Sequence, residues 1–189
     1  MAQIYLASRS PRRRELLSQL NIQYQLVDGE IDESQLLDES AIDYVIRLAC
    51  EKAQQGWQNC DKTMPVLGSD TIVVYQNQLL GKPANEQDGL NTLSLLSGNQ
   101  HQVITAVAIK WQDNIETVVV SSDVEFAQLD EQEILAYWQT GEPQDKAGSY
   151  AIQGIGGQFV KSIQGSYSAI VGLPLYETKQ LIQKVLKQL

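Results

Sequence analysis

The fold class depends most on residues 103–129, which read VITAVAIKWQDNIETVVVSSDVEFAQL. Two runs rich in β-branched residues, Val103–Trp111 and Ile115–Leu129, are separated by the short polar segment 112–114. Such a segment between two such runs is typical of a β-hairpin. The stretch therefore predicts two long strands joined by a tight turn.

Helices and strands are expected on both sides of this hairpin. The expected strands are Gln3–Ala7, Tyr24–Val27, Val66–Gly68, Thr71–Tyr75, Gln158–Ile163 and Ser166–Val171. The expected helices are Pro11–Leu20, a helix capped by Ser40 that reaches Trp57, Glu86–Leu96 closed by Gly98, a helix capped by Asp130 that reaches Trp138, and Leu175–Leu189. Strands and helices alternate before the hairpin, and the sequence is richer in strands after it. This order predicts an α/β fold with a mixed sheet rather than a regular βαβ array.

We expect residues 1–189 to form a single domain, since this length suits one well-cored domain or two small lobes.

The overall charge limits the classes of partner. A net charge of −9 argues against a general nucleic-acid binder and against attachment to anionic membrane surfaces. No apolar run approaches the roughly 20 residues that a membrane helix needs. The first residues lack the basic and apolar pattern of a signal peptide, so the cytoplasm is the expected location.

The cysteines and the histidine of the chain do not indicate a metal site or a catalytic site. Cys50 and Cys60 form no metal motif and are expected to be free thiols, Cys50 as a small buried helix residue. His101 is the single histidine, which excludes a His-rich metal site. We interpret it as structural rather than as part of a catalytic triad.

The arginines are concentrated near the start of the chain. Four of the five lie between residues 9 and 14, directly after Ser8, where Ser10 is a good N-cap and Pro11 suits the first helical position. Positive side chains oppose the dipole of a bare helix, but they suit a bound phosphate. The alternative is a solvated basic face, which is what most charge runs are. We favour a phosphate site that includes Arg12 and Arg13.

Residues 68–74, GSDTIVV, place Asp70 within an apolar, strand-rich run. A carboxylate there needs hydrogen bonds, a cation or a metal to offset its loss of water. Asp70 therefore either binds a metal or takes a proton from water, or it is a turn residue between two strands. The residues alone favour the turn slightly.

Two lysines could join the same site. Lys52 follows Val45, Leu48 and Ala49 at helical spacing, which places it on the inner face of its helix. It could equally extend to solvent from the edge of that face. Lys82 lies in a Gly-Lys-Pro bend, where a lysine is usually solvated.

A glycine-rich segment and an acidic patch are weaker candidates. Residues 145–157, DKAGSYAIQGIGG, contain three glycines that allow close approach of the backbone, although a plain loop or bulge is the commoner explanation. Gln153 in this segment could pair with the edge of a base. Glu33 lies in an acidic patch and could coordinate a hard cation, although most such carboxylates are simply solvated.

Taken together, these segments resemble the Maf family of nucleotide pyrophosphatases. The matching blocks follow the family's order and cover nearly the whole chain: residues 6–17, Gly68-x-Asp70-Thr71, residues 80–83, Leu96-Ser97-Gly98 followed by His101, residues 145–148, and residues 172–174. Arg9 stands where the family commonly has a small residue.

The resemblance implies hydrolysis of a nucleoside triphosphate to the monophosphate and pyrophosphate, assisted by a divalent cation such as Mg²⁺ or Mn²⁺. It implies catalytic roles for Asp70, as proton acceptor, and for Lys52 and Lys82. It implies metal binding by Glu33 and Asp70, and substrate binding by Ser8, Arg12, Arg13, Thr71 and Gln153. Arg12, Thr71 and Gln153 look like the set of the dTTP/UTP branch. The implied fold is similar to that of inosine triphosphate pyrophosphatases, with a mixed, curved sheet, flanking helices and two lobes around a cleft. Family members are often homodimers.

Three alternatives stay open: a pyrophosphatase for another or modified nucleotide such as 7-methyl-GTP, a non-catalytic nucleotide-binding regulator of cell division, and, more weakly, a nucleic-acid module.

Overall fold

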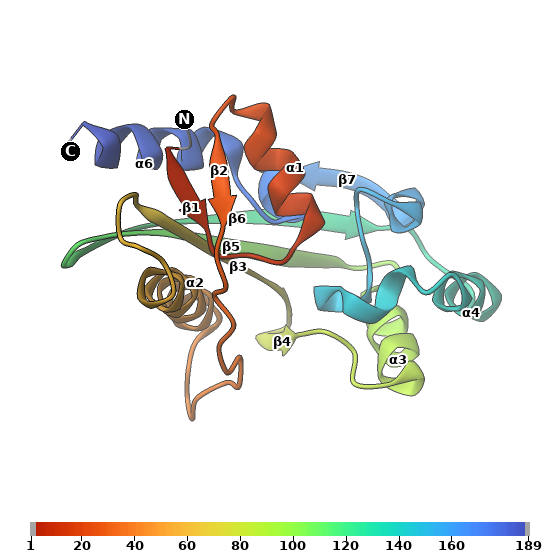
Figure 1. Ribbon diagram of the computed structural model, residues 1–189. Coiled ribbons are helices and arrows are strands. Elements are labelled where there is room, and N and C mark those ends of the chain that lie inside the picture. Colours follow the sequence, from red (N-terminus) through yellow and green to blue (C-terminus); the bar gives the residue numbers. More distant parts are fainter. Residues whose placement is uncertain (1–2, 188–189) are drawn as a thin grey trace. The chain divides into compact units, whose positions relative to one another are not determined.

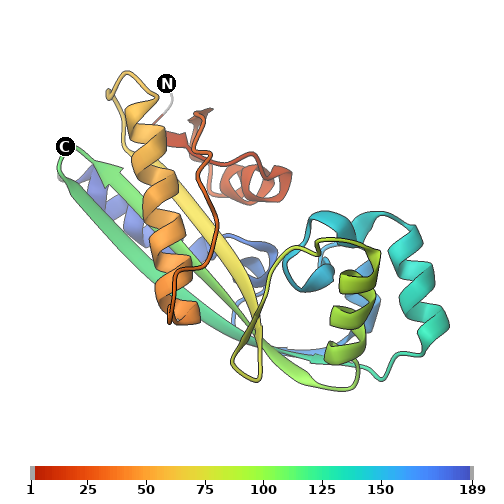
Figure 2. The same cartoon turned by 90° about the horizontal axis from the view of Figure 1, so that it is seen from below.

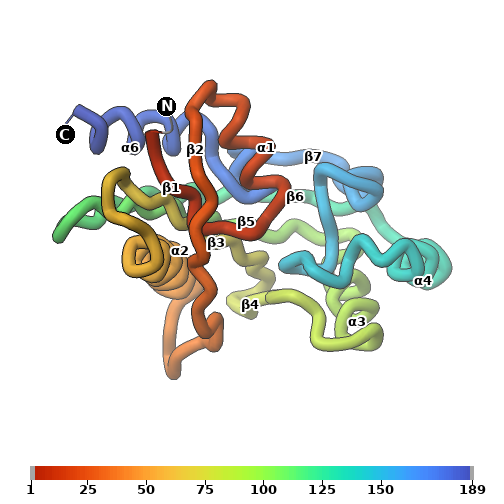
Figure 3. Tube along the Cα trace, in the orientation of Figure 1, coloured from red at the N-terminus to blue at the C-terminus, as the bar shows by residue number. Residues whose placement is uncertain are grey.

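The computed structural model describes residues 3–187, and Figures 1 and 3 follow the chain as a ribbon and as a tube. The strands of this range are β1 (Ile4–Leu6), β2 (Tyr24–Leu26), β3 (Val66–Tyr75), β4 (Gln78–Leu80), β5 (Gln100–Trp111), β6 (Asn114–Phe126) and β7 (Val160–Gln164). The α-helices are α1 (Pro11–Gln19), α2 (Ala41–Gln58), α3 (Glu86–Leu96), α4 (Glu131–Gln139), α5 (Tyr167–Val171) and α6 (Leu175–Leu186). Short 3-10 turns are η1 (Glu142–Asp145), η2 (Ala147–Ser149) and η3 (Ile155–Phe159).

The strands form one seven-stranded sheet in the order β2-β1-β3-β5-β6-β7, with β4 paired to β3. Strands β1, β2 and β3 pair in parallel, whereas β3–β4 and β6–β7 are antiparallel. The predicted fold class, an α/β protein with a mixed sheet and flanking helices, is therefore confirmed. The predicted cleft between two lobes stays a prediction.

The chain divides into two compact units. Unit 1 comprises Met1–Asp70, Thr105–Val120 and Gly172–Leu189, and unit 2 comprises Thr71–Ile104 and Ser121–Val171. Strands β3, β5 and β6 contribute residues to both. That the two units act as a single domain stays a prediction.

In unit 1, helices α2 and α6 cover opposite faces of the sheet, as both views show (Figures 1 and 2). Helix α2 buries the apolar face that its spacing predicts, including Leu48 and Ala53. Gly68 on β3 makes the close approach possible, because an added Cβ there would lie 2.4 Å from the Ala49 carbonyl oxygen. Burial of each large aliphatic side chain contributes about 1.5–3 kcal/mol, which fixes α2 on this strand.

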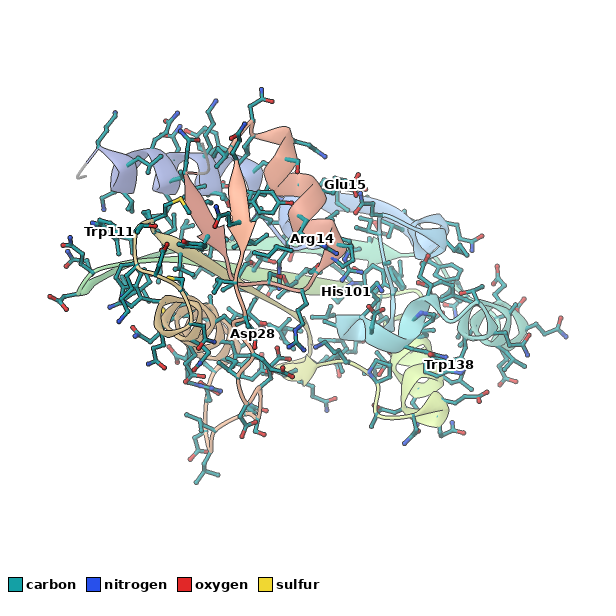
Figure 4. All side chains as sticks on the ribbon, viewed as in Figure 1. Arg14, Glu15, Asp28, His101, Trp111 and Trp138 are labelled. Carbon is teal, nitrogen blue, oxygen red and sulfur yellow. The ribbon has the colours of Figure 1, made fainter. Side chains whose placement is uncertain are left out.

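In unit 2, helices α3 and α4 pack against each other through a large and a small residue. A Cβ added to Gly89 on α3 would lie 2.2 Å from the Trp138 ring on α4, the side chain labelled in Figure 4. Beneath them lies an aromatic core in which Phe126 makes edge contacts with His101 and Tyr150. This core supports the 3-10 turns that follow α4.

Two expectations for secondary structure are wrong. Residues 66–75 form one continuous strand, so Asp70 is not a turn residue between two strands. The buried partner of Asp70, described below, removes the need for a turn. The expected strand Ser166–Val171 is the short helix α5, because the Ser166 side chain accepts a hydrogen bond from the Ala169 N–H. That contact caps a helix.

Smaller differences concern boundaries. The short strand β4, which begins at Gln78, is not among the expected strands. The strand expected at Gln158–Ile163 is Val160–Gln164, preceded by a 3-10 turn. The end of the last expected helix, residues 188–189, lies outside the described residues.

Candidate active site

Helix α1 begins as predicted. The Ser10 side chain accepts a hydrogen bond from the Arg13 N–H (3.4 Å), and Pro11 opens the helix. Ser8 Oγ accepts a hydrogen bond from the Ser10 N–H (3.2 Å), so the loop folds back on the helix start. The first turn carries no acidic residue. A helix N-terminus of this kind, with arginines instead of carboxylates, is suited to an anion.

The arginine cluster is divided by its contacts. Arg9 is exposed and forms ion pairs with Asp28 (3.2 Å), which Figure 4 labels, and with Glu30 (2.8 Å). Arg13 instead donates from Nε to the Gly172 carbonyl oxygen (2.9 Å). Arg9 therefore pairs with acidic residues, whereas the half-buried Arg13 is held by a main-chain carbonyl of unit 1.

The Gly172 carbonyl joins Arg13 to strand β3. It also accepts a hydrogen bond from Ser69 Oγ (3.1 Å), next to Asp70 in the chain. Burial lowers the pKa of Arg13, and the negative charge of Asp70 opposes that change. The guanidinium is thus held within electrostatic reach of the Asp70 carboxylate.

Lys52 lies at the centre of the candidate site. Its Nζ is 2.7 Å from Asp70 Oδ1 and 2.6 Å from Glu33 Oε1. The Lys52 and Asp70 side chains are only 11% and 9% exposed, whereas that of Glu33 is 39% exposed. The inner-face position predicted for Lys52 is correct. One ammonium therefore holds a buried and a half-exposed carboxylate together.

Two residues that the sequence did not single out hold the segment that carries Glu33. Tyr44 donates its hydroxyl to the Glu33 carbonyl oxygen (2.8 Å). Arg47 donates to both Glu39 oxygens (2.6 and 2.8 Å) and to the Ser34 carbonyl oxygen (3.0 Å). Figure 3 shows that this segment runs from β2 to α2 without a strand or helix of its own. Side chains of α2 therefore define its course.

The position of Tyr44 also reflects the charge of the site. Burial, and then the charges of Asp70 and Glu33, raise the pKa of Tyr44 to about 12, so the phenol is a neutral donor. Tyr44 precedes Lys52 by eight residues, about two helical turns. That spacing is the signal that could have identified it.

Arg12 lies in the first turn of α1 in unit 1 and is half-buried, whereas the other candidate residues lie in unit 2. Thr71 follows Asp70 on β3 and is half-buried, whereas Lys82 and Gln153 are exposed. The Gly148 N–H donates to the Gly81 carbonyl oxygen (3.1 Å), which joins the bend of Lys82 to turn η2. Unit 2 therefore brings the Lys82 bend to the segment that leads to Gln153. The structure directly joins Glu33, Lys52 and Asp70 in unit 1.

The carboxylates of Glu33 and Asp70 are suitable ligands for a hard cation. Their oxygens lie within 2.6 and 2.7 Å of one shared ammonium, so both already face one positive charge. Residues 3–187 contain no group of three or more His, Cys, Asp or Glu that could hold a metal ion. Mg²⁺ usually binds one or two carboxylates together with substrate phosphates and water. Glu33 and Asp70 have the ligand chemistry for such a site, in which substrate phosphates and water would supply the other ligands.

Two carboxylates and a buried ammonium beside an arginine-bearing helix start, on a mixed α/β sheet, are features that suit a protein that binds phosphorylated ligands. Comparison with known sequences is more specific: the family described as "Maf-like protein" matches residues 3–185. The chain belongs to this family.

Relatives in the family are similar over nearly their full length. A protein of Pseudoalteromonas translucida named dTTP/UTP pyrophosphatase is 57% identical over 184 residues, 97% of each chain. A protein of Vibrio cholerae with the same name is 50% identical over 184 residues, 97% of this chain and 98% of that one.

Solved structures show weaker similarity. The Ham1 protein of Staphylococcus aureus aligns with a TM-score of 0.46 at 14% identity, covering 66% of this chain and 72% of that one. A nucleoside-triphosphatase, dITP/XTP pyrophosphatase, of Mycobacterium abscessus aligns with a TM-score of 0.45 at 17% identity, covering 67% and 75%.

Proposed function

We propose that this protein hydrolyses dTTP and UTP to the monophosphate and pyrophosphate, and so clears these nucleotides from the cellular pool. Family membership and the names of relatives at 50–57% identity support the reaction and the substrates. The observation that carries the proposal is the buried Lys52, which joins Asp70 and Glu33 beside Arg13.

Asp70 is the proton acceptor in this proposal. Water attacks the α-phosphorus, the bond from that phosphorus to the bridging oxygen of the β-phosphate breaks, and pyrophosphate leaves with its electron pair. The water proton passes to an Asp70 oxygen. Asp70 is suited to this role because Lys52 fixes one of its oxygens at 2.7 Å. A fixed base within reach of water is what general-base catalysis requires.

The cationic residues hold the triphosphate. Arg12 and Arg13, together with the Ser8 hydroxyl at the start of α1, bind phosphate oxygens, and Lys52 and Lys82 stabilise the charge that develops on the leaving group. Each well-placed donor of this kind is worth about 3–4 kcal/mol in the transition state. A divalent cation, Mg²⁺ or Mn²⁺, held by Glu33 and Asp70 would neutralise further charge on the triphosphate.

Thr71 and Gln153 recognise the pyrimidine base. The Gln153 amide offers one acceptor and two donors, which matches the alternating donor and acceptor groups of uracil and thymine. Gln153 is exposed on unit 2.

The proposal also covers location and assembly: a cytoplasmic protein, either a monomer or a homodimer, without a nucleic-acid or membrane partner. Within residues 3–187, no helix is both long and apolar enough to cross a bilayer.

A product assay with a panel of nucleotides tests the function. Pyrophosphate and phosphate release are measured with dTTP, UTP, CTP, GTP and 7-methyl-GTP, with and without Mg²⁺. We expect pyrophosphate from dTTP and UTP, with kcat/KM at least about 100-fold above that for 7-methyl-GTP. The reason is that a base of another shape leaves the polar groups that recognise a pyrimidine without hydrogen-bond partners. Stepwise phosphate release would contradict attack at the α-phosphorus. A preference for 7-methyl-GTP would favour a pyrophosphatase for a modified nucleotide. Tight binding without turnover would favour a non-catalytic regulator of cell division, and a mobility shift of an oligonucleotide would favour a nucleic-acid module.

A further inference from the structure

Glu142, at the start of η1, has an unusual set of partners for a carboxylate. Its Oε1 accepts hydrogen bonds from the Tyr137 hydroxyl (2.7 Å) and the Gly156 N–H (2.9 Å), and its Oε2 accepts one from the Ile155 N–H (2.9 Å). Two of the three donors are main-chain groups of η3. The carboxylate therefore fixes the course of a backbone segment.

These contacts keep Glu142 charged. Burial raises the pKa of Glu142, but the bonds from Gly156, Tyr137 and Ile155 outweigh it, and the net effect is a pKa below the usual value. A carboxylate that is ionised at neutral pH accepts hydrogen bonds only and makes strong ones to N–H groups.

Tyr137 extends the same contact to the other end of the segment. Its hydroxyl oxygen accepts a hydrogen bond from the Ala151 N–H (3.1 Å) while its proton goes to Glu142. The pair Tyr137–Glu142 therefore holds Ala151 at one end and Ile155 with Gly156 at the other. Gln153 lies in the middle of this span.

The glycines of the segment are explained by this arrangement. A Cβ added to Gly154 would lie 2.2 Å from Glu142 Oε2, and one added to Gly156 would lie 2.5 Å from the Tyr137 hydroxyl oxygen. Only residues without side chains at these positions let the backbone approach the Glu142 carboxylate and the Tyr137 hydroxyl this closely.

We propose that Glu142, together with Tyr137, is a positioning residue that sets where Gln153 stands and so determines selectivity for the nucleotide base. The proposal rests on the proposed role of Gln153 in reading the pyrimidine. Glu142 touches neither the phosphates nor the base in this account. It acts through the main chain of residues 151–156.

The test compares Glu142→Gln, Tyr137→Phe and Gln153→Ala with wild type. Glutamine is similar in shape, but it loses the charge and places an N–H₂ group where the backbone N–H donors need an acceptor. Because hydrogen bonds to a charged acceptor are the stronger ones, their loss should raise KM for dTTP about tenfold or more, while kcat stays within about threefold. Selectivity for dTTP over GTP should fall in parallel in all three variants.

Glu131→Gln is the matched control, since Glu131 is an exposed carboxylate of the neighbouring helix α4. It should leave KM and selectivity unchanged. The double variant Glu142→Gln/Gln153→Ala should be no worse than the poorer single variant, because residues that act through one another are not additive. Hydrogen exchange at the Ile155 and Gly156 amides should be faster in Glu142→Gln.

Three results would overturn the proposal: losses that multiply in the double variant, an unchanged KM in Glu142→Gln, or faster exchange at residues 151–156 with unchanged selectivity. The last result would show a purely structural role. If wild type releases no pyrophosphate from dTTP or UTP, the proposed function fails by itself. The coupling between Glu142 and Gln153 is then measured with dissociation constants for dTTP, and no coupling there overturns this proposal too.

Discussion

Two carboxylates in different units of the molecule are held in opposite ways. In unit 1, Asp70 is held by the ammonium of Lys52, a group at the end of a long side chain. In unit 2, Glu142 is held by two backbone N–H groups and a tyrosine hydroxyl. A side-chain partner can move when a phosphate or a cation arrives, whereas backbone partners are fixed by the fold. The first arrangement therefore suits chemistry and the second suits positioning.

The largest effect should come from Asp70→Asn. The amide keeps the size of the side chain but cannot take a proton from water, so kcat for dTTP should fall about 100- to 10,000-fold, the range of general-base catalysis. Pyrophosphate release measures the loss.

The fold should survive this change, because Lys52 keeps Glu33 as a partner and the asparagine oxygen still accepts its hydrogen bond. Circular dichroism and thermal unfolding provide the control. Near-normal turnover by the folded variant would reject the role of Asp70 and remove the contrast with Glu142.

The sequence predicts most of the elements but not all of the contacts. Local signals were sufficient for the hairpin around residues 112–114, for the Ser10 and Asp130 caps and for the inner face of α2. They failed at residues 66–75, because the partner that allows Asp70 to be buried within a strand is Lys52, which lies 18 residues earlier in the chain, on α2. Spacing within one element cannot show such a partner.

The same limit applies more strongly to Glu142. Its two main-chain partners lie 13 and 14 residues away on a segment without regular periodicity. The glycines of residues 154–157 signalled a close approach, but a pattern of glycines does not name the group that approaches. The position of Tyr44 near the site could have been predicted from the sequence, because it lies on the same helix as Lys52.

A second prediction tests unit 2 through His101. Its ring is buried between Phe126 and Tyr150, with Nε2 hydrogen-bonded to the Tyr150 hydroxyl (2.8 Å), and burial lowers the pKa of His101 to about 4. In the unfolded chain His101 binds a proton below pH 6.5, whereas in the folded chain it binds one only below about pH 4. The stability contributed by neutral His101 is therefore present above pH 6.5 and is lost as the pH falls. The loss should reach about 3 kcal/mol, since each pH unit is worth up to about 1.4 kcal/mol per proton.

Urea unfolding between pH 7 and pH 4 measures this loss. His101→Gln should be less stable at pH 7 but should show a shallower decline with acid, because it removes the chain's single histidine. If the free energy of unfolding of wild type and variant declined equally with acid, the acid sensitivity would not come from His101.

The fluorescence of Trp138 reports on unit 2, and that of Trp57 and Trp111 reports on unit 1. A Trp138→Phe background shows whether unit 1 follows the same transition.

The smallest effect should come from Arg47→Lys, which tests how the other carboxylate of unit 1, Glu33, is held. Lysine keeps the charge but loses the planar fork that contacts both Glu39 oxygens and the Ser34 carbonyl, so the segment carrying Glu33 should become less well ordered. The Mg²⁺ concentration for half-maximal activity should rise about three- to fivefold, which is under about 1 kcal/mol, while kcat at saturating Mg²⁺ stays nearly constant. Glu51→Gln removes only the exposed pair with Arg47 and serves as the control. If Arg47→Lys instead lowered kcat and left the Mg²⁺ dependence unchanged, Glu33 would not be a cation ligand, and Asp70 would have to act without it.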